Sequence, residues 1–217
     1  MTFTIGIFDL FTYAIPGSLY VALVTYMSLR LQLTTVDELA SSMPTALLII
    51  VVATASYVLG HVSYSVGLVV DKVLPLWRRE SLNARKVFAV RMPGCANSAI
   101  LRSGYGLLRA AVEMRDREVA AEITRLRAVG LMLRNLTVPL VLAFVLAVVE
   151  AALGGHRVEA LTVAAVALLA ASGAAWRSFT LRHWSDLKTL EVCFWIPDLN
   201  QTLEAGMPTD ETPPPRY

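Results

Sequence analysis

A polar stripe of Tyr57, His61 and Tyr64 interrupts an otherwise apolar segment and is the first candidate for chemistry in this chain. The residues are four and three positions apart, so a helix places them on one face. Histidine can exchange a proton near neutral pH, and an ionisable residue inside a membrane span is a candidate for an ion or proton pathway. Alternatively, neutral His61 forms a hydrogen bond to a neighbouring helix. The stripe therefore predicts either a pore or gate, or a helix contact.

Motifs that carry catalysis are sparse in this sequence. Arg177 and His183 have an Arg-x5-His spacing that resembles the short motif of HEPN-type ribonucleases. Six helical steps leave their side chains about 120° apart, which disfavours joint catalysis. The chain has no phosphate-binding glycine loop, no zinc-helix signature and no Gly-x-Ser-x-Gly elbow. We predict a protein that is not an enzyme and needs no metal or cofactor, with a HEPN-like ribonuclease as a remote alternative.

The elements that must position these residues are apolar blocks. Hydrophobic residues make up 56% of the 217 residues and charged residues only 17%. The hydrophobic share is higher, and the charged share lower, than is usual in a soluble protein. Four blocks, 10–33, 44–70, 136–153 and 158–175, fall within or near the length that crosses about 30 Å of hydrocarbon. The alternative for the last two is burial in a soluble core. The sequence predicts an all-α integral membrane bundle with four transmembrane helices.

The apolar blocks and the breakers between them divide the chain into five segments. These are a first transmembrane hairpin (1–70), a basic helical segment (71–135), a second transmembrane hairpin (136–175), a juxtamembrane amphipathic helix (176–196) and a disordered Pro-rich tail (197–217). The tail is assigned from its proline and acid content.

The distribution of Lys and Arg predicts the orientation in the membrane. The net charge is only +2, but residues 71–135 hold thirteen Lys and Arg against six acids. Short loops rich in Lys and Arg remain in the cytoplasm. With four spans, we expect both termini in the cytoplasm and the loops near Met43 and Gly155 outside, which corresponds to a multi-pass protein of the cell membrane.

The basic segment is also the predicted contact surface for a partner. Juxtamembrane Lys and Arg most often bind anionic lipid headgroups, and an acidic cytoplasmic protein is the alternative. Nucleic acid is not favoured because aromatic residues for base stacking are few. Pairs at helical spacing, Arg109 with Glu113 and Glu122 with Arg125, are also expected. The cations predicted to contact lipid or a partner are Arg78, Arg79, Arg85, Lys86, Arg125 and Arg127.

Two stripes of small residues predict close helix packing. In lipid, helices associate through small side chains that let their backbones approach. The stripes also make a homo-oligomer possible, because the packing partner can be the same chain or another copy. The residues are Ala53, Ser56, Gly60, Ser63 and Gly67 in the second block, and Ala160, Ala164, Ala167, Ala171 and Ala174 in the fourth.

Charges and prolines near the ends of the blocks have simpler explanations. Arg30 and Glu150 fall at the same predicted membrane level, so we expect surface or interfacial ion pairs there. Pro16 and Pro139 are expected near helix starts, where a missing N–H is tolerated.

Two short stretches, 8–17 (FDLFTYAIPG) and 57–61 (YVLGH), resemble segments of small bacterial multi-pass membrane proteins, some of them encoded near phage-defence genes. The resemblance implies a bacterial cytoplasmic membrane and a role in antiviral defence or stress through membrane disruption. Two functions are therefore kept open at this point. One is an oligomeric pore or membrane-perturbing effector controlled by the basic segment, and the other is a non-catalytic membrane anchor or scaffold for a cytoplasmic partner.

Overall fold

The computed structural model describes residues 2–31, 43–73, 83–95, 97–154 and 156–206. Within these residues the protein consists of eight α-helices and has no strand, so the predicted all-α class is confirmed. The elements are α1 (Thr2–Arg30), α3 (Thr45–Val73), α4 (Ala84–Arg91), a 3₁₀ turn (Pro93–Cys95), α5 (Ala99–Arg102), α6 (Tyr105–Arg115), α7 (Arg117–Leu153), α8 (Arg157–Phe194) and α9 (Leu199–Ala205).

The chain divides into two compact units. Unit 1 comprises Met1–Arg78 and Arg127–Arg182, and unit 2 comprises Arg79–Leu126 and His183–Tyr217. Each unit therefore combines two stretches that are far apart in the sequence.

Three helices are long and apolar enough to cross a membrane, by length and composition. They are α3, over Thr45–Gly67, and the whole of α7 and α8. These helices indicate a membrane localisation and a possible multi-pass protein. The helix α1 is 29 residues long but is not one of the three, so the fourth predicted span stays a prediction.

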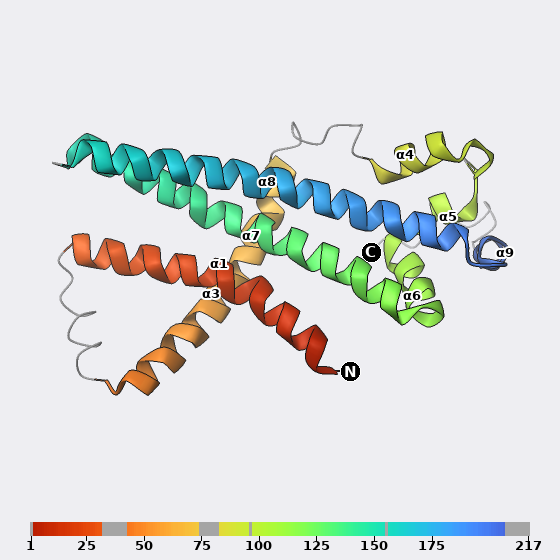
Figure 1. The fold of residues 1–217 in the computed structure, drawn as a ribbon, viewed down its shortest axis with the longest axis horizontal. Coiled ribbons are helices and arrows are strands. Elements are labelled where there is room, and N and C mark those ends of the chain that lie inside the picture. Colours follow the sequence, from red (N-terminus) through yellow and green to blue (C-terminus); the bar gives the residue numbers. More distant parts are fainter. Residues whose placement is uncertain (1, 32–42, 74–82, 96, 155, 207–217) are drawn as a thin grey trace. The chain divides into compact units, whose positions relative to one another are not determined.

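In unit 1, α1 and α3 cross each other (Figure 1). Neither helix has an acid in its first turn. Pro16 lies inside α1 and Pro139 inside α7, so the prediction that these prolines sit near helix starts was wrong. Proline is tolerated inside a membrane helix when neighbouring helices satisfy the backbone group it frees.

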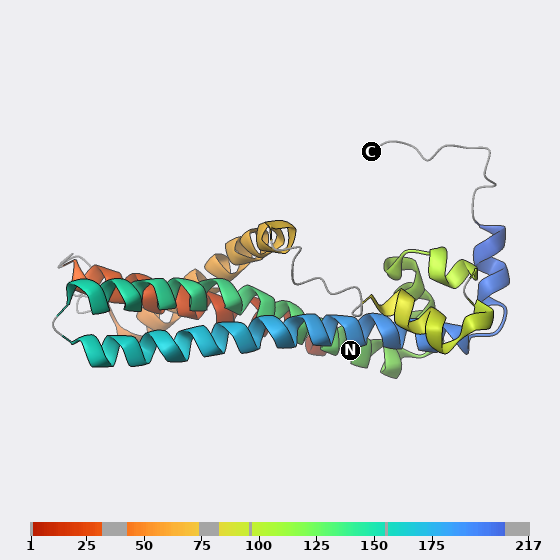
Figure 2. The same cartoon turned by 90° about the horizontal axis from the view of Figure 1, so that it is seen from above.

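The helices α7 and α8 are each longer than one membrane span and run antiparallel (Figures 1 and 2). In unit 1, a Cβ on Gly130 would lie 3.4 Å from the Ser178 carbonyl oxygen. In unit 2, the Ser185 hydroxyl donates to the Ile123 carbonyl at 3.3 Å. The segment boundaries predicted after residues 135 and 175 lie inside these helices, because no breaker ends the helix at either place.

Unit 2 has a hydrophobic core of its own. Leu108 of α6, Leu190 of α8 and Ala99 of α5 are fully buried, and Phe88 of α4 packs with them. Asn83 caps α4 by accepting a hydrogen bond from the Arg85 N–H at 3.1 Å, as an N-cap asparagine commonly does.

The helix α9 corrects the predicted disordered tail. Residues 199–205 are helical, and Leu203 is buried in the core of unit 2. The Asn200 side chain also accepts a hydrogen bond from the Ala99 N–H at 2.9 Å. The prediction from proline content was therefore wrong for residues 199–205. Buried Leu203 and the Asn200 hydrogen bond attach α9 to the core of unit 2. Residues 207–217 of the predicted tail lie outside the described residues.

Candidate functional site

The centre of unit 1 is a contact between backbones at the crossing of α1 and α3. A Cβ on Gly60 would overlap the Tyr13 carbonyl oxygen and lie 2.9 Å from the Tyr13 Cα. A Cβ on Gly17 would overlap the Ser56 carbonyl oxygen and lie 2.9 Å from the Gly60 nitrogen. Only glycine fits at both positions, because the atoms in the way belong to the backbone.

This close approach brings the ring of Tyr13 onto the polar stripe of α3. The Tyr13 and His61 rings are stacked, with centroids 3.9 Å apart and planes inclined by 15°. Tyr57 meets the His61 ring edge to face at 4.9 Å, and Tyr64 meets the Tyr13 ring edge to face at 6.3 Å. The structure thus places the predicted Tyr57, His61 and Tyr64 in one cluster and adds Tyr13 from α1 to it.

His61 and Tyr57 are exposed residues on the surface of unit 1, and one face of the imidazole is covered by the Tyr13 ring. His61 lies 16 residues after the start of α3 and 12 before its end, or about 24 Å and about 18 Å at 1.5 Å per residue. A hydrocarbon layer of about 30 Å placed anywhere along α3 therefore includes His61. In a membrane, this ionisable group faces lipid unless water or protein covers it.

A second group of polar residues joins α3 to α7. The Ser63 hydroxyl donates to the Asn135 carbonyl at 3.2 Å, and the Arg134 guanidinium lies over the Tyr64 ring, 4.9 Å from its centroid. Ser63 and Asn135 are fully buried, and Arg134 is 7% exposed. A Cβ on Gly67 would lie 3.2 Å from both the Arg134 Nε and the Asn135 Oδ1. The site is therefore a band of polar groups that continues from the exposed His61 into the unit.

Sequence reasoning missed three members of this band. Tyr13 lies in the first apolar block, and Arg134 and Asn135 lie at the end of the basic segment 71–135, and none of the three was among the predicted site residues. One signal was available, because Asn135 precedes Pro139 by four residues, and its carbonyl therefore lacks its helical donor.

The predicted small-residue stripes occupy different environments along their helices. Ser56, Gly60, Ser63 and Gly67 are buried, whereas Ala53 is exposed. The contacts near Gly60 explain this difference, since α1 and α3 cross there and Ala53 lies two turns away. The alanines of α8, Ala160, Ala164, Ala167, Ala171 and Ala174, are all buried.

At the far end of unit 1, α1 and α7 are joined by an ion pair. The Arg30 guanidinium donates twice to the Glu150 carboxylate, at 2.7 and 3.0 Å. The contact confirms that Arg30 and Glu150 form an ion pair, whereas its position at a membrane interface stays a prediction. Its bidentate geometry is stronger than a single contact.

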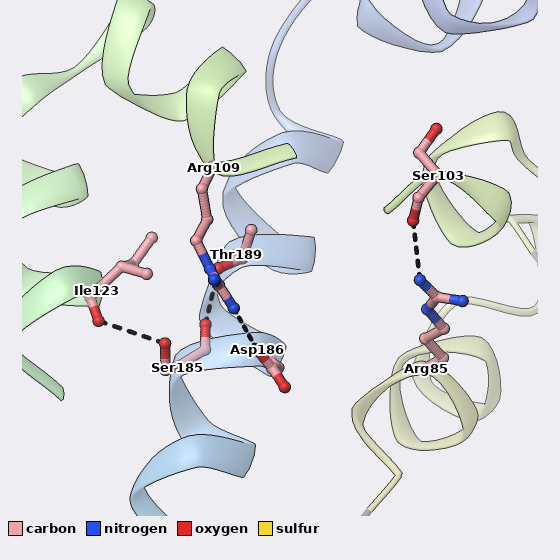
Figure 3. A network of polar contacts seen from close by, with 7 residues as sticks. All are labelled: Arg85, Ser103, Arg109, Ile123, Ser185, Asp186 and Thr189. Atoms are coloured by element: carbon pink, nitrogen blue, oxygen red, sulfur yellow. Dashed lines mark hydrogen bonds and ion pairs between the residues drawn. The ribbon is translucent and has the colours of Figure 1, made fainter. Parts of the chain in front are cut away.

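In unit 2, polar contacts tie α8 to the helices around it (Figure 3). The Arg109 guanidinium donates to the Asp186 carboxylate at 2.8 Å, and Lys188 pairs with Glu122 at 2.6 Å. Arg109 and Glu122 were predicted to pair with Glu113 and Arg125 of their own helices. Instead, both pair with residues of α8. These contacts fix α8 against α6 and α7.

The cations predicted to contact lipid or a partner are not equivalent. Arg85 donates to the Ser103 carbonyl at 2.8 Å and lies over the Tyr105 ring, so it serves the fold of unit 2. Lys86, Arg125 and Arg127 are exposed. Arg78 and Arg79 lie outside the described residues.

Tyr105 lies near two guanidinium groups and a carboxylate. Arg85 and Arg109 approach its ring, with the Cζ atoms 4.9 and 5.8 Å from the centroid. Burial raises the pKa of the Tyr105 phenol, and the negative charge of Asp186 raises it further, whereas the two arginines lower it. The net shift is upward, so the phenol remains protonated at neutral pH and packs as a neutral group.

The two residues of the Arg-x5-His pattern both belong to α8, where Arg177 is exposed and His183 half-buried. The chemistry of the band in unit 1 is of another kind, namely a titratable imidazole among phenols, followed by buried hydroxyl, amide and guanidinium groups. Such a band can bind or pass small polar species, but it contains no activated nucleophile. No protein-family model, curated protein or solved structure matches this chain, and no family is assigned to it.

Proposed function

We propose that this chain is a four-span protein of the bacterial cytoplasmic membrane whose copies assemble into a pore or a membrane-perturbing effector. The observation that carries the proposal is the exposed His61 at a depth that lies inside the hydrocarbon layer. Ionisable residues within a membrane face protein or a water-filled cavity, because lipid does not solvate them. Copies that surround a polar path meet this requirement, and a single copy in lipid does not.

The composition of the exposed face supports assembly around His61. Its neighbours on the surface of α3 include Val58 and Val62, which are suited to lipid, next to the polar ring of Tyr57. An interface between copies that covers the Tyr57 and His61 rings leaves the valines in lipid. The polar band behind His61 then continues the path into each copy through Tyr64, Arg134 and Ser63.

A non-catalytic anchor or scaffold is the second candidate. The observation that favours it is unit 2, which has its own hydrophobic core and cross-helix ion pairs. A separately packed unit is suited to binding a cytoplasmic partner. In the pore, the same unit receives the controlling signal, and the exposed Lys86 and Arg125 offer contacts to acidic lipid headgroups or protein.

The orientation in the membrane is proposed from the charge distribution. Residues 71–135 contain thirteen Lys and Arg, and this favours a cytoplasmic location for the segment and for both termini. The last of these cations, Arg134, packs on Tyr64 of α3, so we assign it to the end of the segment that meets the membrane. Reporter fusions after Met43 and Gly155 should then report the outside, and fusions after Arg79 or Tyr217 the cytoplasm. An outside signal after Arg79 would overturn the orientation.

Water access at His61 tests the proposed path. In chains with Cys95 and Cys193 replaced by alanine, we expect a charged, membrane-impermeant thiol reagent to modify His61→Cys much faster than Val62→Cys. The two positions have the same depth, and Val62 is exposed on the face that we assign to lipid. Equal and slow modification of both variants would favour the anchor, because the imidazole position would then be closed to water.

A further inference from the structure

Pro139 leaves one carbonyl of α7 without its helical donor. In an α-helix, each carbonyl accepts a hydrogen bond from the N–H four residues later. Proline has no N–H, so the carbonyl of Asn135 cannot be satisfied within α7. Asn135 and Pro139 are both fully buried, and an unsatisfied buried carbonyl is costly, especially in a membrane.

A side chain of α3 supplies the missing donor. The Ser63 hydroxyl donates to the Asn135 carbonyl at 3.2 Å, and Ser63 is 1% exposed. Its oxygen also lies 3.5 Å from the Tyr20 phenol oxygen, so α1 contacts the same hydroxyl. The backbone of α7 at its proline is thus completed by the α1–α3 hairpin.

Neighbouring contacts hold α3 in this register. The Arg134 guanidinium lies over the Tyr64 ring, and Gly67 leaves room for the Arg134 and Asn135 side chains, which a Cβ there would meet at 3.2 Å. Ser63 lies two residues after His61 in the same helix, so a displacement of α3 at His61 reaches the Asn135 carbonyl directly.

We propose that Ser63 and Pro139 form a latch between the hairpin and α7. While Ser63 caps the Asn135 carbonyl, α7 has a satisfied backbone at its proline. When α3 moves, the carbonyl loses its donor and α7 gains a hinge at Pro139, a common cause of helix bending. The latch couples the His61 site to α7, and its role as a gate rests on the proposed function.

A double-mutant cycle tests the latch. Ser63→Ala should lower the melting temperature of the full-length protein in detergent, because the Asn135 carbonyl is left buried without a donor. In a Pro139→Ala background, the Ala N–H restores the helical bond, so most of the effect of Ser63→Ala should disappear. Ser178→Ala is the matched control, since Ser178 is equally buried and its hydroxyl has no partner among the described residues. An equal effect of Ser63→Ala in both backgrounds would overturn the latch.

A distance measurement tests the hinge without relying on stability. Spin labels are attached to genetically encoded keto amino acids in place of Arg127 and Val149, which are both exposed on α7. The two positions lie on either side of Pro139 and roughly 33 Å apart along a straight helix. Ser63→Ala should broaden the distance distribution, and Ser63→Ala with Pro139→Ala should restore the narrow one. An unchanged distribution in Ser63→Ala would contradict the hinge. Melting temperatures and spin-label distances do not depend on permeation. The latch can therefore be confirmed in a protein that conducts nothing, and it can fail in a protein that conducts.

Discussion

Replacing Gly60 with leucine should separate α1 from α3 and dismantle the site at His61. Even a single Cβ on Gly60 would overlap the Tyr13 carbonyl oxygen, and the backbone in its way cannot swing aside as a long side chain does. Overpacking of this kind costs about 1–3 kcal/mol or more, and leucine adds three further carbons to it. Gly17→Leu should act in the same way, since it meets the Ser56 carbonyl oxygen.

The measurement is the distance between spin labels in place of Val24 on α1 and Val51 on α3, both exposed, together with the melting temperature of the protein. Gly60→Leu and Gly17→Leu should lengthen or broaden this distance and lower the melting temperature. Gly173→Leu is the matched control, because a Cβ at Gly173 meets nothing within 4 Å. A Gly60→Leu variant with the wild-type distance and melting temperature would refute the backbone contact.

The sequence was sufficient for the helical class and for three of the candidate spans, because lipid imposes long apolar helices that composition reveals directly. It also marked Gly60 and Ser63, since small residues at helical spacing are easily recognised. It could not identify Tyr13 as the partner of His61. That choice depends on the angle at which α1 and α3 cross, and on the register that Gly17 permits.

The pairing of charges in unit 2 was beyond sequence reasoning for a related reason. Arg109 has an acid four residues away in its own helix, yet it pairs with Asp186 of α8. Spacing along one helix predicts only local pairs, whereas the tertiary packing of α6 on α8 offers a closer and less exposed carboxylate. Leu203 is likewise buried only because α9 packs on the core of unit 2, although the composition of this stretch indicated disorder.

His61→Phe should abolish or strongly reduce permeation while the fold persists. Phenylalanine keeps an aromatic ring that can stack on Tyr13, so the contact at 3.9 Å is largely preserved. It removes the two nitrogens that exchange protons or bind polar species. A tenfold loss of rate corresponds to about 1.4 kcal/mol in the barrier, and we expect a loss of at least this size. In an anchor, the same change should leave the melting temperature nearly unchanged, because the contacts of His61 in the structure are ring contacts with Tyr13 and Tyr57, which phenylalanine can also make.

The most direct measurement is ion flux across the membrane of vesicles that contain the purified full-length protein, compared among the wild type, His61→Phe and Val62→Phe. The account predicts flux in the wild type, loss of flux in His61→Phe, and wild-type flux in Val62→Phe, whose exposed side chain we assign to lipid. Wild-type protein that assembles in the vesicles yet conducts nothing, or equal losses in both variants, would contradict a path at His61.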